Sequence, residues 1–397
     1  LEITVRGGGH SYAGACLTDD GLMIDLSRMR GVHVDPDARI ARCGGGASWA
    51  DVDGATQQFG LAVPGGMISH TGIGGLTLGG GIGWLTRRHG LVIDNLLAAE
   101  VVLADGAIVR ASAEEHPDLF WALRGGGGNF GVVTEFEYRL HPIGPEIQFG
   151  LFFWPLDQTA EALRLSRDTI HGLNRDATGF IAPLNAPPES FVPEEYHLLP
   201  GTVLIIVGFG SAEEHAALVA PVREALPPLF ELVTPMPYVA LQQVFDAGFA
   251  WGIRAYTKSL YLEDLTDDAI AVIAEHLPAK RSPMTTVPIF MLGGAFRDVD
   301  DADTAFGGSR SACCWFVIDG LAPDAQTLAA ERMWTRGLWQ ALRPLAVNAG
   351  GYVNAMAEYE ENVVRESYGP KYDRLARIKA EYDPGNVLHH NANIKPA

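Results

Sequence analysis

Glycine is concentrated in a few short segments of this chain, and this distribution restricts the possible folds more than any other feature. Most glycines before residue 145 lie in five clusters, at 7–9, 44–46, 65–66, 72–83 and 125–131. Glycine allows positive φ and lets a backbone approach a neighbouring group closely. Apolar residues such as Ile73, Leu76 and Leu78 interrupt the longest cluster, at 72–83. One side of this segment can therefore pack in the core, while its other side exposes backbone without side chains. We therefore expect short strands and glycine loops that lie along a long bound ligand.

The bulk composition describes a globular protein. Of 397 residues, 47% are hydrophobic and 19% are charged, which suits two or three folding units. The net charge of −19 repels nucleic acid and anionic lipid, and no run of about 18 uncharged apolar residues is present to cross a membrane. We therefore expect no nucleic-acid partner and no membrane partner, and the oligomeric state stays open.

Four cysteines do not indicate a disulfide scaffold. Cys313 and Cys314 are adjacent within an apolar run and are expected to be small buried residues, while Cys16 and Cys43 are isolated. No C-x-x-C pair and no Cys/His zinc spacing is present. We expect no metal ion.

From residue 148 to residue 344, strand-like runs alternate with amphipathic segments. Helices are expected at 160–170, 212–225 and 267–276, and strands at 203–209, 254–260, 287–292 and 312–318. Such a series indicates a sheet covered by helices on one face. After residue 350 we expect another strand at 351–355 and two charged helices. The sequence therefore predicts an α+β fold with two domains.

Two glycine motifs resemble phosphate-binding loops. Residues 126–131 satisfy G-x-G-x-x-G, which in a dinucleotide site follows a strand and opens a helix. Here a helix-like segment precedes the motif and a strand at 132–138 follows it, so a nicotinamide-type site is disfavoured. The segment from Arg6 to Ser11 leaves the first strand and exposes successive N–H groups that can bind a pyrophosphate. An ordinary turn, with His10 as a hydrogen-bonded loop residue, is the alternative.

Together these segments resemble the FAD-linked oxidases of the berberine bridge enzyme-like group, within the vanillyl-alcohol oxidase superfamily. The resemblance runs from residue 1 to residue 397. It rests on R-G-G-G-H-S at 6–11, I-D-L-S at 24–27, the block from 69 to 95, D-L-F-W-A-L-R-G at 118–125 leading into G-N-F-G-V-V at 128–133, K-S at 258–259, Y-D-P-G-N at 382–386 and N-x-N-I at 391–394.

The resemblance implies a PCMH-type FAD-binding domain built from both chain ends, with an inserted substrate domain whose antiparallel sheet is covered by helices. The expected domains are the FAD-binding domain at 1–147, the substrate-binding domain at 148–350 and a berberine-bridge-like segment at 351–397. Relatives carry a further half-domain before the R-G-G-G-H strand, so an N-terminal part is expected to be missing. We expect a cytoplasmic protein, with secretion open because a signal peptide would lie in that part.

The resemblance also implies that His10 bonds to the 8α-methyl carbon of FAD. Some relatives carry a second link from a cysteine before the G-x-G-G stretch, but no cysteine occurs between residues 44 and 312. We therefore expect FAD with one link, through His10. The other residues predicted to bind the cofactor are Arg6, Gly7, Gly8, Gly9, Ser11, His70, Thr71, Gly72, Gly74, Gly75, Gly79, Gly83, Gly131, Val133, Asn391 and Asn393.

Two residues are predicted to act in catalysis. Tyr352 matches a Tyr-x-Asn motif that relatives place near the flavin, and Lys258 lies in a strand of the substrate domain. A phenol, with a pKa of about 10, needs a positive neighbour or hydrogen bonds to act as a base near neutrality, and Lys258 or Arg310 can supply the charge. The alternatives are a half-buried structural tyrosine and a lysine that faces water.

The resemblance therefore implies an enzyme, an FAD-dependent oxidase that moves a hydride from a small organic alcohol or amine to the flavin. The expected partners are this small-molecule substrate and molecular oxygen as electron acceptor. Two alternatives remain open: a flavin dehydrogenase with another acceptor, and a catalytically silent flavin-binding or drug-sequestering protein. The identity of the substrate stays open.

Overall fold

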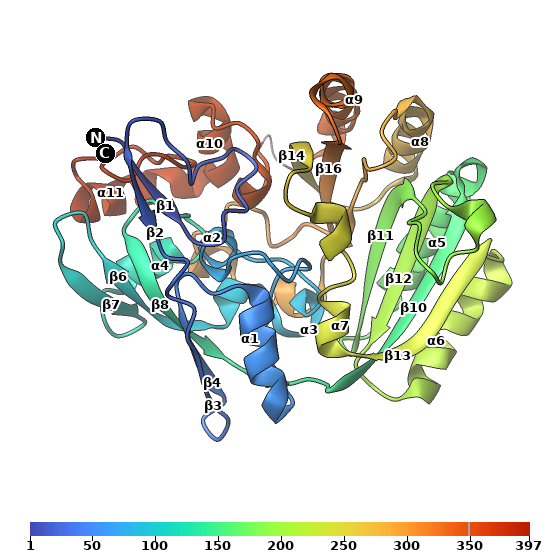
Figure 1. The fold of residues 1–397 in the computed structure, drawn as a ribbon, viewed down its shortest axis with the longest axis horizontal. Helices are drawn as coiled ribbons and strands as arrows, with labels where there is room; N and C mark the ends of the chain where they lie inside the picture. The colour runs from blue at the N-terminus through green and yellow to red at the C-terminus, as the bar shows by residue number, and fades with distance from the viewer. Residues whose placement is uncertain (348–349) are drawn as a thin grey trace.

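A five-stranded antiparallel sheet organises the N-terminal part of the chain. The computed structural model describes residues 1–347 and 350–397 (Figure 1). In spatial order the strands of this sheet are β3 (Val32–Asp35), β4 (Ile40–Gly44), β8 (Val132–Arg139), β6 (Leu96–Val102) and β7 (Ile108–Ser112). A parallel pair, β1 (Ile3–Arg6) and β2 (Leu22–Asp25), and a short antiparallel pair, β5 (Leu61–Ala62) and β9 (His141–Pro142), complete the strands of this region.

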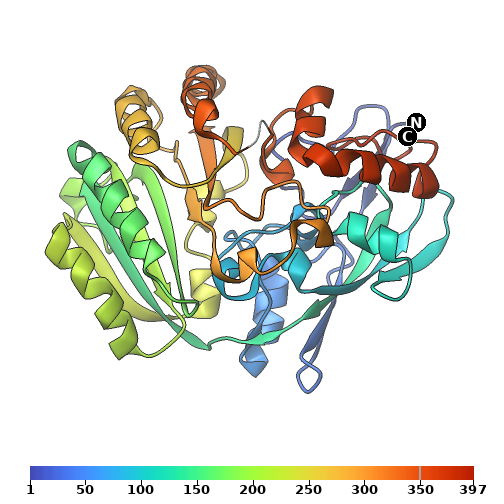
Figure 2. The same cartoon turned by 180° about the vertical axis from the view of Figure 1, so that it is seen from behind.

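Helices from both ends of the chain accompany this sheet. They are α1 (Trp49–Thr56), α2 (Ile73–Gly79), α3 (Thr86–His89), α4 (Pro117–Leu123), α10 (Glu361–Tyr368) and α11 (Tyr372–Tyr382). Figures 1 and 2 show α10 and α11 on the N-terminal half of the molecule, with the two chain termini side by side. The return of the C-terminal segment to the N-terminal half agrees with the expected plan. The domain boundaries at 147/148 and 350/351 stay predictions.

A seven-stranded antiparallel sheet occupies the middle of the chain. Its strands, in spatial order, are β13 (Phe230–Pro237), β10 (Glu146–Pro155), β12 (Pro200–Gly208), β11 (Ala177–Asn185), β15 (Ile289–Met291), β16 (Cys314–Ala322) and β14 (Arg254–Leu262). The helices of this half are α5 (Thr159–His171), α6 (Ala212–Ala225), α7 (Tyr238–Leu241), α8 (Asp267–His276) and α9 (Ala325–Leu342). Figures 1 and 2 show α5, α6, α8 and α9 on the outer face of the sheet. The prediction of an antiparallel sheet with one helix-covered face is confirmed.

Alternation of side chains along these strands gives the seven-stranded sheet two different apolar faces. On β10, Phe152 and Trp154 pack among the helices, while Phe149 and Phe153 point to the opposite face. Successive side chains of a strand point to opposite faces, and helices on only one face leave the other free to meet the N-terminal half. That second face forms one wall of the cavity described below.

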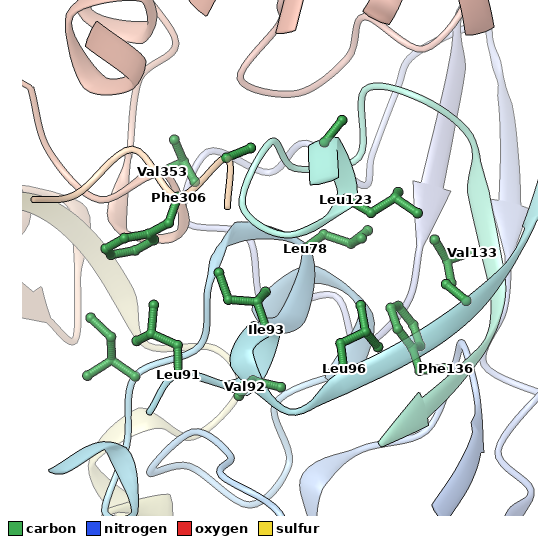
Figure 3. Close-up of a cluster of buried hydrophobic side chains, with 14 of the residues drawn as sticks. Leu78, Leu91, Val92, Ile93, Leu96, Leu123, Val133, Phe136, Phe306 and Val353 are labelled. Atoms are coloured by element: carbon green, nitrogen blue, oxygen red, sulfur yellow. The ribbon is translucent and has the colours of Figure 1, made fainter. Parts of the chain in front are cut away.

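The largest core lies between the N-terminal sheet and the helices that accompany it. Figure 3 shows part of it, where Leu78 of α2 packs with Ile93 and Leu96. Phe306 and Val353, from distant parts of the chain, enter the same core. This shared core fixes the glycine-rich helix α2 against the C-terminal segment. None of the helices in the described part of the chain is long and apolar enough to cross a membrane.

Two local predictions are wrong. The cluster at 72–83 is not a continuous loop, because α2 forms over Ile73–Gly79 and buries Ile73 and Leu78. The segment at 351–355 is not a strand, since a short 3-10 helix forms over Val353–Ala355. There the Tyr352 N–H donates to Ser259 Oγ at 3.0 Å, and the Ala355 N–H donates to the Tyr352 carbonyl. A 3-10 turn and a contact with Ser259 of β14 therefore take the place of a strand ladder at this position.

Candidate functional site

A cavity of about 1060 Å³ lies between the two halves of the molecule. One wall is made by glycine loops of the N-terminal half, and the other by the free face of the seven-stranded sheet. The side chains of that face are almost all apolar, and they include Phe149, Leu151, Phe153, Phe180, Ile205, Phe290, Trp315 and Val317. A long molecule with polar and apolar parts fits such a space, because bare backbone N–H groups line one wall and aromatic rings the other.

Most of the predicted cofactor-binding residues line this cavity. They are Gly7, Gly8, Gly9, His10, Ser11, Thr71, Gly72, Gly74, Gly75, Gly131, Val133 and Asn391. The loop at 7–9 and the loop at 71–72 touch, and a Cβ on Gly8 would lie 2.2 Å from the Gly72 nitrogen. No other residue type permits that approach. The two glycine loops therefore form a single continuous wall.

The other five predicted cofactor residues do not line the cavity. Arg6 pairs with Asp25 at 3.2 Å on the surface. A Cβ on Gly79 would meet the Asn354 side chain, and one on Gly83 would meet the Gly65 carbonyl. The remaining two are Asn393 and His70, and Nδ1 of His70 lies 2.6 Å from Nε2 of His10.

His10 is held by two neighbours on the glycine wall. Its Nε2 lies 2.6 Å from Nδ1 of His70, and its Nδ1 lies 3.5 Å from the Thr71 hydroxyl. The Trp251 ring packs on it with a centroid distance of 4.9 Å. Burial, followed by the neighbouring His70, lowers the pKa of His10 to about 4. The imidazole is therefore neutral near pH 7 and keeps a lone pair for bond formation.

The loop that carries His70 is anchored to the other half of the molecule. Asp246 accepts hydrogen bonds from the Ser69 N–H at 2.8 Å and from the Ser69 hydroxyl at 2.6 Å. Asp246 lies just after α7, in the half that carries the seven-stranded sheet. This contact fixes the backbone next to His70, and through it the His10 ring.

Tyr352 is buried and lines the cavity. Its hydroxyl oxygen accepts hydrogen bonds from the Gly81 N–H at 2.6 Å and from Asn354 Nδ2 at 2.8 Å. The Trp315 ring meets it edge-on at 5.0 Å. Burial raises the pKa of Tyr352, and the two donors oppose this rise without cancelling it. The group is therefore a neutral phenol whose oxygen is fixed by two N–H donors.

Lys258 does not lie in the cavity lining, and this placement argues against its predicted catalytic role. Its ammonium lies 3.4 Å from Glu358 and over the Trp339 ring of α9. Lys258 alternates with Thr257 and Ser259 along β14, so its side chain points to the helix-covered face. Arg310 is also committed elsewhere, because it forms a buried ion pair with Asp94 at 2.7 Å. Neither cation is placed to act on Tyr352.

Several site residues carry no clear signal in the sequence. Asp319 of β16 lines the cavity and accepts a hydrogen bond from the Thr257 hydroxyl at 2.6 Å, and burial raises its pKa to about 6. Asn354 positions the Tyr352 hydroxyl. Asp319 could have been found from strand alternation: it lies two residues after Val317 on β16, so both side chains point to the cavity face.

The cavity wall fits a flavin cofactor by two further observations. A Cβ on Gly75 would meet no atom within 4 Å, so bare backbone of α2 faces open space. Asn391 Oδ1, Tyr368 Oη and Trp315 Nε1 belong to lining residues and have no hydrogen-bond partner within residues 1–347 and 350–397. Buried polar groups of this kind are normally paired with a ligand or water. A glycine-walled cavity with a neutral histidine and unpaired polar groups suits a flavin cofactor and the redox chemistry that it supplies.

Comparison with known proteins leads to the same class. The family model described as FAD binding domain matches residues 1–112, and the model described as berberine and berberine like matches residues 351–395. The (R)-6-hydroxynicotine oxidase of Paenarthrobacter nicotinovorans is 31% identical over 100% of this chain and 86% of its own length. The chain belongs to the berberine bridge enzyme-like family of FAD-linked oxidoreductases. It is accordingly an enzyme that uses FAD.

Solved structures show the same PCMH-type fold. The 6-hydroxy-D-nicotine oxidase of Arthrobacter nicotinovorans superimposes with a TM-score of 0.85 at 28% identity, covering 100% of this chain and 87% of that one. A glucooligosaccharide oxidase of Acremonium strictum with a 6-S-cysteinyl, 8α-N1-histidyl FAD superimposes with a TM-score of 0.83 at 24% identity, covering 100% and 87%. The predicted α+β architecture is confirmed.

Proposed function

We propose that this enzyme oxidises a small, largely apolar amine or alcohol with FAD bound covalently to His10, and that molecular oxygen reoxidises the flavin. The observation that carries the proposal is that His10 and Tyr352 line one cavity whose opposite wall is aromatic. The wall residues Phe149, Phe180 and Phe290 favour an apolar substrate over a sugar, which needs many hydrogen-bond partners. When bound, the flavin supplies the acceptor for a hydride from the substrate carbon.

We propose that Tyr352 positions the reacting group of the substrate. Its oxygen already accepts hydrogen bonds from Gly81 and Asn354, so its own proton is free to bond a substrate nitrogen or oxygen. A raised pKa keeps that proton in place near neutrality. A neutral amine can lose a hydride without first losing a proton, whereas an alcohol needs a base. The protonated phenol therefore favours an amine substrate over an alcohol.

The His10 link is supported by the orientation of its ring. His70 holds the Nε2 atom at 2.6 Å, so the more weakly held Nδ1 is the proposed attachment atom. The test is to precipitate the purified protein in acid and to measure its absorption spectrum and intact mass. We expect the yellow colour to stay with the protein, together with the mass of one FAD. Both should be lost in His10→Ala, and colour in the wild-type supernatant contradicts the covalent link.

The substrate proposal is tested by screening paired apolar amines and alcohols under anaerobic conditions for flavin bleaching. We expect bleaching by aromatic or alicyclic amines before the matching alcohols, and rapid return of the colour in air. Slow return in air favours the dehydrogenase alternative, in which another acceptor takes the electrons. If no ligand bleaches the flavin of the wild type, the silent flavin-binding alternative is favoured.

We also propose a cytoplasmic location, since all four cysteines are free thiols.

A further inference from the structure

A cluster of three metal-ligating side chains lies outside the flavin cavity. His171 ends α5, Asp264 lies in the connection after β14, and Cys313 immediately precedes β16. Their ligand atoms all lie within 4.8 Å of one another. None of the three lines the cavity, and Cys313 packs in the apolar core beneath the helices. The cluster therefore has no part in the flavin site.

Cys313 and Asp264 contact the same nitrogen of His171. The Nε2 atom of His171 lies 3.3 Å from Cys313 Sγ and 3.3 Å from a carboxylate oxygen of Asp264. In a nucleophilic Cys-His-Asp relay the thiol and the carboxylate bond opposite nitrogens of the imidazole. Here one nitrogen cannot donate its single proton fully to both neighbours. The geometry is that of three donor atoms around one point.

We propose that His171, Asp264 and Cys313 bind one divalent transition-metal ion of the zinc type, with water as the fourth ligand. Zinc takes nitrogen, carboxylate oxygen and thiolate ligands at about 2.0–2.3 Å in a tetrahedral arrangement, which places neighbouring donor atoms roughly 3.3–3.6 Å apart. The two separations of 3.3 Å from His171 Nε2 are close to this spacing. The ligand set of one thiolate, one imidazole and one carboxylate suits zinc better than calcium or magnesium.

The surroundings of the cluster allow an ion to enter and to remain. The side chains of His171 and Asp264 are 40% and 46% exposed, so solvent reaches the site and can supply the fourth ligand. Cys313 is buried in the apolar core and supplies the third ligand atom from the protein side. When the metal binds, the Cys313 thiol releases its proton to solvent as the sulfur–metal bond forms.

An ion at this position would join three elements that no disulfide joins. The end of α5, the connection after β14 and the start of β16 would share one centre. Trp315 follows Cys313 by two residues and faces the flavin cavity, so the metal would fix the start of a strand that lines the substrate space. We expect a structural role, seen as stabilisation of the seven-stranded sheet by the ion.

The experiment uses the flavin-loaded enzyme after removal of metals with a chelator. Zn²⁺ is titrated by calorimetry, and Co²⁺ is then added as a spectroscopic probe, because a cobalt–thiolate bond gives a charge-transfer band in the near ultraviolet. The variants are Cys313→Ser, His171→Gln and Asp264→Asn. Cys314→Ala is the matched control, since Cys314 is the adjacent cysteine, is buried, and lies outside the cluster.

We expect one Zn²⁺ per chain, a Co²⁺ charge-transfer band and a higher melting temperature with Zn²⁺. Each of the three ligand variants should bind Zn²⁺ at least tenfold more weakly and Cys313→Ser should lose the cobalt band, whereas Cys314→Ala should keep both. Zinc binding that is absent in the wild type, or unchanged in all three ligand variants, overturns the proposal. A cobalt band that disappears in Cys314→Ala and persists in Cys313→Ser also overturns it.

Discussion

His10 and His70 illustrate how one contact can set both the charge and the orientation of a side chain. Burial and the second imidazole hold the pKa of His10 at about 4, which keeps the ring uncharged. The 2.6 Å contact with His70 also selects the nitrogen that stays available. A neutral ring with a fixed tautomer is the form required for attack on the 8α-carbon. Burial and the His70 contact together therefore give His10 the charge and orientation that the proposed link requires.

We expect His70→Ala to lower the fraction of covalently bound flavin several-fold, because the His10 ring loses the partner that fixes its tautomer and its rotation. The fraction is measured from the absorbance that remains with the acid-precipitated protein. His33→Ala is the control, since His33 is exposed on β3, outside the cavity lining. A covalent fraction in His70→Ala equal to that of the control contradicts the positioning role.

Tyr352→Phe is expected to lower the rate of anaerobic flavin reduction about 10-fold, because the substrate loses the hydrogen bond that positions its reacting group. The covalent flavin content should stay unchanged, because Tyr352 does not contact His10. The loss also leaves the Gly81 N–H without its acceptor, which costs about 1–3 kcal/mol of stability. Stopped-flow reduction and thermal unfolding measure the two effects separately. An unchanged reduction rate excludes Tyr352 from the reaction.

At the scale of elements, local signals predicted some helices and missed others for identifiable reasons. Ser211 and Glu214 form a capping box at the start of α6, and Thr266 caps α8, so their boundaries follow from the sequence. Helix α2 was not predicted, because its three glycines have low helix propensity. It forms because tertiary packing buries Ile73 and Leu78 in the core shown in Figure 3.

Two glycines of α2 are expected to respond to alanine in opposite ways. A Cβ on Gly79 would lie 2.2 Å from Asn354 Oδ1, so Gly79→Ala should cost about 1–3 kcal/mol and displace the residue that holds Tyr352. A Cβ on Gly75 would meet nothing within 4 Å, so Gly75→Ala should leave the melting temperature of flavin-free protein unchanged or higher. It should instead lower flavin content, because the methyl group enters the cavity. Melting temperature and flavin-to-protein ratio distinguish the pair, and equal behaviour of the two variants contradicts this account.

At the scale of the whole molecule, contacts between distant residues escape prediction from the sequence. The resemblance predicted the glycine wall and His10, because those residues lie in contiguous motifs. The catalytic role of Lys258 stays a prediction, and its place outside the cavity lining was not foreseen, since the strand pattern alone did not say which face meets the cavity. Asp319 and Asn354 act through partners far away in the chain, and the His171–Asp264–Cys313 cluster has no spacing motif at all. Only the packing of complete sheets brings such groups together.

Asp53 shows how such a long-range contact affects the stability of the molecule. It is a buried residue of α1, and its carboxylate accepts one hydrogen bond, from Gln242 after α7, at 3.0 Å. Its other oxygen has no partner within the described residues. Burial raises the pKa of Asp53 to about 7, compared with about 3.9 in an unfolded chain. The unfolded state therefore loses its proton first, and stability falls as the pH rises from about 4 to about 7.

Asp53→Asn should remove this dependence. Between about pH 5 and about pH 8 the wild type should lose on the order of 3 kcal/mol of stability through this group, whereas the variant should not. Asp51→Asn is the control on the same helix, because burial there is outweighed by Arg30 and Ser48, which lower the pKa of Asp51, so its stability contribution is lost only at more acidic pH. Denaturant unfolding at several pH values measures the difference. If the free energy of unfolding depends on pH in the same way in the wild type and in Asp53→Asn, the Asp53 carboxyl does not titrate in this range. The contact between α1 and the segment after α7 would then be more solvated than the burial of Asp53 indicates.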